Sequence, residues 1–175
     1  MRRYGGVNMK SITLALLLLL GNYSVGAVET IDIAQVEKAH YFDFLQGNWS
    51  YQFEQGKGTA QYERDSHTGA VIGTINGEIN NSKFTGKSLT FFSKEKGWQR
   101  RWIDTLGNVL QGEVQLNDYE PAKGKALVSY VKFGDMYIKH IWYNISASRF
   151  ETDLLMSKDG EQYQLVRRMP YIKQQ

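Results

Sequence analysis

The sequence predicts an all-β protein, an antiparallel up-and-down β-barrel of about ten strands preceded by one short N-terminal helix. Apolar and polar residues alternate with a period of two from Trp49 almost to the end of the chain. Turn signals separate the alternating stretches at intervals of roughly 8–13 residues. Seventeen glycines, two prolines and 13% aromatic residues favour strands and tight turns over long helices.

The first 27 residues predict a signal peptide rather than part of the fold. Lys10 precedes the apolar run Leu14–Leu20, which is too short to span a bilayer as a stable anchor. Val25 and Ala27 place small residues at the −3 and −1 positions of a cleavage site. We expect cleavage after Ala27, a mature domain over 28–175 and a periplasmic or secreted location, with an uncleaved N-terminal anchor as the alternative.

Charge and cysteine content exclude several classes of function. Three of the 21 lysines and arginines lie in residues 1–27, which hold no acid, so the remainder has as many acidic as basic residues. A neutral domain gives no electrostatic reason to expect nucleic acid or an anionic membrane as a partner. The chain contains no cysteine, which excludes disulfides and thiolate chemistry and fits a bacterial exported protein.

One helix is predicted within residues 30–45, ahead of the strands. Ile33, Val36, Tyr41 and Phe44 fall on one helical face, and Asp32 can cap the start. We expect this amphipathic helix to lean on or plug the structure that follows.

The strands follow as one continuous series. Trp49, Tyr51 and Phe53 share one face of the first alternating stretch. The later predicted strands cover 57–64, 69–80, 86–93, 98–104, 108–116, 124–133, 136–146, 149–157 and 161–169. All connections are short, which favours a meander, and closure into a barrel is the simplest way to avoid exposed edges.

The barrel opens with the motif Phe42-Asp43-Phe44-Leu45-Gln46-Gly47-Asn48-Trp49. It resembles the Phe-Asp-Phe-Leu-x-Gly-x-Trp start of a large group of uncharacterised, mostly bacterial domains that are similar to lipocalin-like (calycin) barrels. The resemblance spans nearly all of 41–170, although the chain departs from the group at 160–163. It implies that Trp49 seals the barrel floor under a late-strand cation, with Arg167 the first choice and Arg168 the second.

The interior of such a barrel is the candidate site, because a barrel of this strand number can enclose one small ligand. We expect inward aromatic residues to line it, with Arg100 or Arg167 as the polar anchor. The expected ligand-binding residues are Trp49, Tyr51, Phe53, Phe91, Trp98, Arg100, Trp102, His140, Trp142, Phe150 and Arg167.

Arg100 decides what kind of ligand is expected. Alternation places Trp98, Arg100, Trp102 and Asp104 on one strand face, so Arg100 lies between two indoles if that face points inward. A buried guanidinium needs a partner. Either Asp104 supplies it, in which case the pair is structural, or an anionic ligand does.

Three hypotheses remain open from the sequence. The first is an exported lipocalin-like domain that binds a small, partly apolar molecule. The second is a barrel enzyme, a hydrolase or isomerase with His140 as its base, although no catalytic constellation is evident. The third is a filled barrel that serves as an envelope interaction module. The sequence indicates no metal site and no cofactor, and no stable membrane anchor after signal cleavage.

Overall fold

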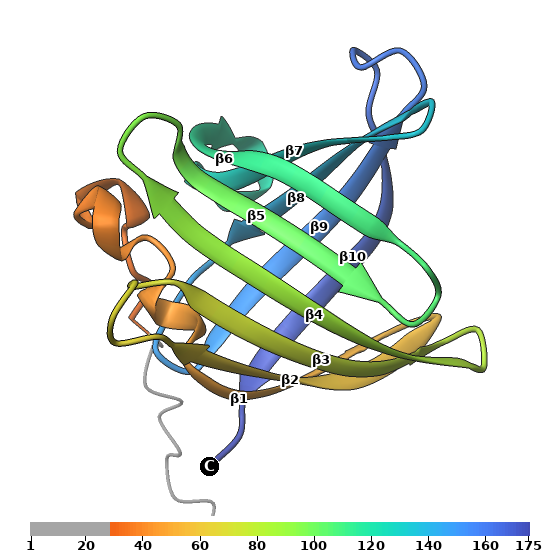
Figure 1. Ribbon diagram of the computed structural model, residues 1–175, viewed down its shortest axis with the longest axis horizontal. Coiled ribbons are helices and arrows are strands. Elements are labelled where there is room, and N and C mark those ends of the chain that lie inside the picture. The colour runs from red at the N-terminus through yellow and green to blue at the C-terminus, as the bar shows by residue number, and fades with distance from the viewer. Residues whose placement is uncertain (1–28) are drawn as a thin grey trace, which may run out of the picture.

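The computed structural model describes residues 29–175, so the predicted signal peptide lies outside the described residues. Ten strands pair antiparallel with their sequence neighbours, and β1 closes the sheet against β10 (Figure 1). The predicted up-and-down barrel is therefore confirmed. The strands are β1 (Gly47–Phe53), β2 (Gly56–Arg64), β3 (Val71–Ile79), β4 (Ser82–Ser93), β5 (Gly97–Asp104), β6 (Val109–Tyr119), β7 (Gly124–Phe133), β8 (Met136–Tyr143), β9 (Arg149–Ser157) and β10 (Gln164–Lys173).

The predicted N-terminal helical segment is present as three separate 3-10 turns, η1 (Ile33–Gln35), η2 (Lys38–His40) and η3 (Asp43–Leu45). The Asp32 carboxylate caps η1 by accepting a hydrogen bond from the backbone N–H of Ala34 at 3.1 Å, as expected. Extended backbone at Val36 and Glu37 breaks the helix. No helix within residues 29–175 is long and apolar enough to cross a membrane.

These turns close one end of the barrel, which we call the plug end. Phe42 is fully buried and packs edge-on against Trp98 and Trp142, with ring centroids 5.0 and 5.4 Å away. Trp98 donates its indole N–H to the carbonyl of Lys38, and Trp49 donates to that of Leu45, each at 2.6 Å. Packing onto the barrel therefore determines the path of this segment. The tight turns between β1 and β2, β3 and β4, and β5 and β6 lie at the opposite, hairpin end (Figure 1).

Aromatic rings fill the interior by lying over glycines of neighbouring strands. A Cβ at Gly86 of β4 would overlap the Trp102 ring from β5, and Cβ atoms at Gly58 and Gly77 would overlap the Tyr51 phenol from β1. Glycine within a strand commonly marks such a close approach. The inward face of the β2–β4 wall therefore carries few large side chains of its own.

A second buried cluster lies on the outer side of the wall. Val128, Ile141 and Tyr143 alternate with inward-facing residues yet are almost fully buried. Tyr119, at the end of β6, and Ala122 of the fourth 3-10 turn, η4 (Glu120–Ala122), pack against them. The connection between β6 and β7 therefore covers part of the outer surface.

An ion pair is buried in this outer cluster. The Asp153 side chain has no exposed surface and accepts two hydrogen bonds from Arg168, from Nε at 2.8 Å and Nη2 at 2.7 Å. The hydroxyls of Tyr119 and Tyr143 also donate to this carboxylate. The three partners come from three different strands, so the carboxylate ties β6, β8 and β10 to β9.

Candidate functional site in the barrel interior

Arg100 points into the barrel, as the alternation predicts. Its cross-strand neighbours are Thr90 on β4 and Gly112 on β6, and Trp98 and Trp102 share its face. Of the two alternatives for its partner, the pairing with Asp104 is wrong. Asp104 instead accepts hydrogen bonds from the Trp102 indole at 2.9 Å and from Asn108.

His140 of β8 takes the place expected of Asp104. Its Nδ1 accepts a hydrogen bond from the Arg100 guanidinium at 2.6 Å, so the ring is neutral with its proton on Nε2. Burial, together with the positive charges of Arg100 and Arg167, holds the pKa of His140 well below its usual value. The Arg100 guanidinium also lies over the Trp142 ring, 4.9 Å from its centroid.

A β-bulge in β10 brings a second guanidinium inside. The register against β9 shifts between Leu165 and Arg167, so Val166 is the extra residue. Leu165 therefore faces outward and is half exposed, although simple alternation predicts that it shares the inward face of Arg167. Arg167 faces inward beside Leu154, and Arg168 faces outward to Asp153.

Neither interior guanidinium has a carboxylate partner within residues 29–175. Arg167 lies over the Phe53 ring at 4.8 Å, and its Nε is buried without a hydrogen-bond partner. Burial lowers the pKa of both Arg100 and Arg167 from the usual arginine value. A cation held this way is costly unless something else neutralises it.

Further unsatisfied polar atoms lie near the same level of the barrel. Cross-strand pairing aligns Ser129, His140, Leu154 and Arg167 along one row across β7 to β10. In this row Ser129 Oγ, His140 Nε2 and Arg167 Nε are buried with no partner, and so is Thr152 Oγ1 one inward position nearer the plug end. Buried polar atoms are normally paired, so this concentration indicates a site for a missing partner.

The interior is packed at the plug end and accessible near the arginines. Trp49, Trp98 and Phe150 are almost completely buried around the plug. Arg100 and Arg167 keep an intermediate exposed fraction although both point inward. Part of each of these two side chains therefore remains accessible to water.

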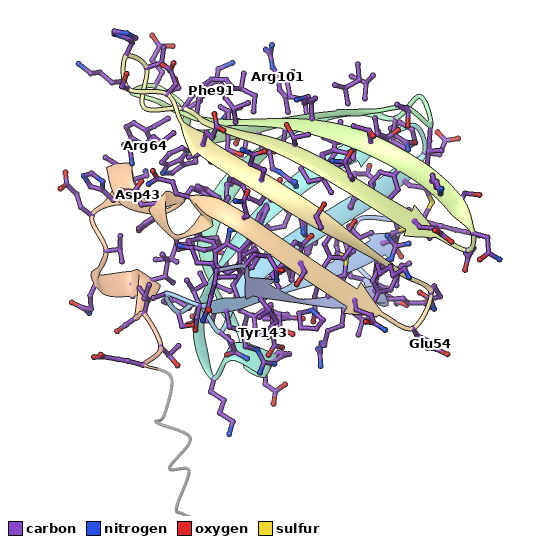
Figure 2. All side chains as sticks on the ribbon, turned by 90° about the horizontal axis from the view of Figure 1, so that it is seen from below. Asp43, Glu54, Arg64, Phe91, Arg101 and Tyr143 are labelled. Carbon is purple, nitrogen blue, oxygen red and sulfur yellow. The ribbon has the colours of Figure 1, made fainter. Side chains whose placement is uncertain are left out.

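Most of the predicted lining residues do face this interior. Phe91 is the exception, because it pairs with Gln99, whereas Phe92 pairs with the inward Trp98. The prediction that Phe91 lines the interior is therefore wrong, and Figure 2 shows it with Arg101 on the outer side of the sheet. The predicted residues that do face inward are Trp49, Tyr51, Phe53, Trp98, Arg100, Trp102, His140, Trp142, Phe150 and Arg167.

Trp49 has the predicted burial but a different cation. Its exposed fraction is 0%, and its ring packs edge-on against Phe150 at 4.7 Å. The cation over the ring is Lys173 Nζ at 5.3 Å, from the last residue of β10, rather than Arg167 or Arg168. Arg167 lies too close to the hairpin end to reach Trp49, since it precedes Lys173, the partner of Trp49, by six residues on β10.

Two tyrosines beside the arginines are not among the residues predicted from the sequence. Tyr62 and Tyr171 are buried on the inward face, and Arg100 lies close enough to influence the pKa of both. Burial is the main cause that raises the pKa of each phenol, so both are neutral at pH 7. Tyr62 shares its strand face with Ala60, and Tyr171 shares its face with Met169. This spacing of two was a signal that could have placed both tyrosines inside.

The arrangement around His140 does not resemble a catalytic base. No carboxylate or hydroxyl of the described residues hydrogen-bonds to the ring, and Nδ1 is engaged by a cation. A strongly lowered pKa makes the imidazole a weak proton acceptor. No group of three or more potential metal-ligating side chains occurs within 29–175.

Two hollows lie on the outer surface of the wall. The larger, of about 880 Å³, is lined mainly by outward polar residues of β1 to β4, such as Thr59, Asn76 and Thr85. The smaller, of about 480 Å³, lies beside exposed aliphatic residues of β3 to β6. Both are distinct from the space beside Arg100 and Arg167.

Fold and interior together define a lipocalin-like β-barrel with a positively charged interior. No protein-family model matches the chain, and no curated protein matches it. Among solved structures, the chain is similar to the S-type phycobiliprotein lyase CPES from Guillardia theta, with a TM-score of 0.55 and 8% sequence identity. The match covers 82% of this chain and 96% of that one. At this identity the likeness shows the shared fold.

Proposed function

We propose that the mature protein is an exported, lipocalin-like binding protein that holds a small, partly apolar anion inside the barrel. The observation that carries this proposal is the pair of interior guanidiniums, Arg100 and Arg167, which have no carboxylate partner within the described residues. A ligand anion between them would supply charge-assisted hydrogen bonds in a low-dielectric site. His140 Nε2 would add a neutral donor.

The surroundings support an apolar body on the same ligand. Toward the hairpin end, Phe53 and Trp102 face inward and keep an intermediate exposed fraction, as does Leu154 at the level of Arg167. Apolar walls with a few convergent polar groups are typical of small-molecule sites. The plug end is already filled, so we place the anionic group at the level of the arginines and the apolar part toward the hairpin end.

Arg100→Met is expected to weaken binding of anilinonaphthalene sulfonate, a small aromatic anion, by at least about tenfold, or about 1.4 kcal/mol. The variant is expected to melt at or above the wild-type temperature, because removal of an uncompensated buried charge can stabilise a protein. Fluorescence titration and thermal unfolding measure the two effects.

Arg101→Met is the matched control, since Arg101 is the next residue of β5 and is exposed on the outer face. It is expected to bind the dye as the wild type does. Equal losses in both variants, or a large loss of stability in Arg100→Met, would contradict an interior anion site.

Export forms the second part of the proposal. Lys10, the run Leu14–Leu20 and the small residues Val25 and Ala27 support a cleaved signal peptide, and the opening motif at 42–49 supports membership of the uncharacterised group that it resembles. We expect the mature chain to begin at Val28 or within one or two residues of it. N-terminal sequencing of the exported protein tests this, and a mature form that retains Leu14–Leu20 would refute it.

A further inference from the structure

We propose that the ligand carries two negative charges, either on one phosphate group or on two neighbouring carboxylates, so that each of the two unpaired interior guanidiniums gains a counter-charge. This inference rests on the proposed function and makes it more specific, because it sets the charge of the ligand. It follows from a count of the ionisable groups that face the interior space.

The positive side of the count consists of two groups. Arg100 and Arg167 both face inward, and each lies over an aromatic ring rather than beside an acid. His140 contributes no charge, because its Nδ1 already accepts the hydrogen bond from Arg100. The two guanidiniums also belong to one cluster, since Arg100 hydrogen-bonds to His140, and His140 lies in the same cross-strand row as Arg167.

Among the described residues, no carboxylate faces the interior at the level of Arg100 and Arg167. Tyr62 and Tyr171 remain neutral phenols, and Tyr51, whose pKa burial raises to about 12, does so too. Asp104, the inward carboxylate on the strand of Arg100, keeps its own charge, but it lies four residues nearer the hairpin end and accepts hydrogen bonds from the Trp102 indole and Asn108 rather than from a guanidinium. A singly charged ligand would therefore leave one guanidinium without a counter-charge in a site where desolvation is costly.

The donors at this level also outnumber the two oxygens of a single carboxylate. Arg167 Nε, His140 Nε2 and the Ser129 hydroxyl are buried and unpaired, in addition to the remaining N–H groups of Arg100. A phosphate group presents three acceptor oxygens, and two carboxylates present four. Either dianion could satisfy these donors together with both charges.

The test compares ligands with one apolar chain and different head groups. Isothermal titration calorimetry at pH 8 measures octyl phosphate, octylsuccinate, octyl sulfate and octanol against the wild-type protein. The second pKa of a phosphate monoester is about 6, so octyl phosphate is a dianion there, whereas octyl sulfate has a similar shape and one charge. We expect at least one dianion to bind at least about tenfold more tightly than octyl sulfate, and octanol to bind most weakly.

Arg167→Met tests the origin of the preference. With one guanidinium left, we expect the advantage of the dianion over octyl sulfate to fall below about threefold. Arg101→Met on the outer face is expected to keep the full advantage. Far-ultraviolet circular dichroism checks that both variants are folded. If a variant does not fold, the comparison of the dianions with octyl sulfate on the wild-type protein still decides the proposal.

The outcomes separate the two levels of the proposal. Equal binding of octyl sulfate and both dianions would overturn the dianion inference and leave the anion-binding function standing. Absence of binding by every charged probe would overturn the proposed function itself. Tight binding of octyl phosphate alone would identify a single phosphate group, and tight binding of octylsuccinate alone would identify a pair of carboxylates.

Discussion

Trp49→Ala is expected to lower the free energy of unfolding by about 3–5 kcal/mol, the range for truncation of a large aromatic core residue. The side chain is completely buried, packs against Phe150 and donates its indole N–H to the Leu45 carbonyl. The substitution leaves a cavity beneath the plug and removes a hydrogen bond that attaches the plug to the barrel. Urea unfolding followed by far-ultraviolet circular dichroism measures the loss.

Phe133→Ala provides the comparison, because this aromatic residue lies at the hairpin end of β7 and is 40% exposed. Its truncation is expected to cost less than about 1 kcal/mol. A similarly small cost for Trp49→Ala would mean that Trp49 does not seal the barrel. Trp49→Phe would keep the ring contact and lose the hydrogen bond to Leu45.

Asp153→Asn is expected to destabilise the protein by about 3 kcal/mol, the lower end of the range for breaking a buried ion pair. The variant removes the charge that accepts hydrogen bonds from Arg168, Tyr119 and Tyr143. Arg168 is 48% exposed, so its guanidinium still reaches water, which moderates the cost. Asp118→Asn is the control, because that carboxylate is 83% exposed and its loss should leave stability unchanged.

The same pair predicts how stability depends on pH. Burial acts to raise the pKa of Asp153, but hydrogen bonds from Arg168 and Tyr119 outweigh it and hold the pKa below its usual value. The stabilisation is therefore fully present above the unfolded-state pKa of about 3.9 and is lost as the pH falls through the lower folded-state value. Thermal melts from pH 6 to pH 2 should fall less steeply for Asp153→Asn than for the wild type.

Alternation was sufficient to predict the strands and most of the inward residues, because a barrel wall with one buried face imposes a period of two. Alternation alone did not show which face of β4 points inward. On β4 three successive inward positions, Gly86, Ser88 and Thr90, are small, and the Trp102 ring from β5 fills the space in front of Gly86. The aromatic Phe91 was therefore assigned to the wrong face.

The partners within the site could not be obtained from one strand at a time. His140 lies 40 residues from Arg100 and reaches it across the interior, whereas Asp104 lies four residues away on the same face and binds elsewhere. The bulge at Val166 reverses the alternation just before Arg167, and no single residue in the sequence marks it. Similarly, a helical pattern over 30–45 gave way to three short turns, because burial of Phe42 and Leu45 against the barrel outweighs local propensity.

The glycines of β2 to β4 also suggest how the binding volume could be engineered. Each ring that lies over a glycine occupies the space that a side chain at the glycine position would need. The side-chain sizes at the two positions are therefore expected to covary, so that a larger residue at Gly86 requires a smaller one at Trp102. Such exchanges would redistribute volume along the wall without altering Arg100 or Arg167. If the proposed site holds a ligand, its selectivity for ligand size and for ligand charge could therefore evolve independently.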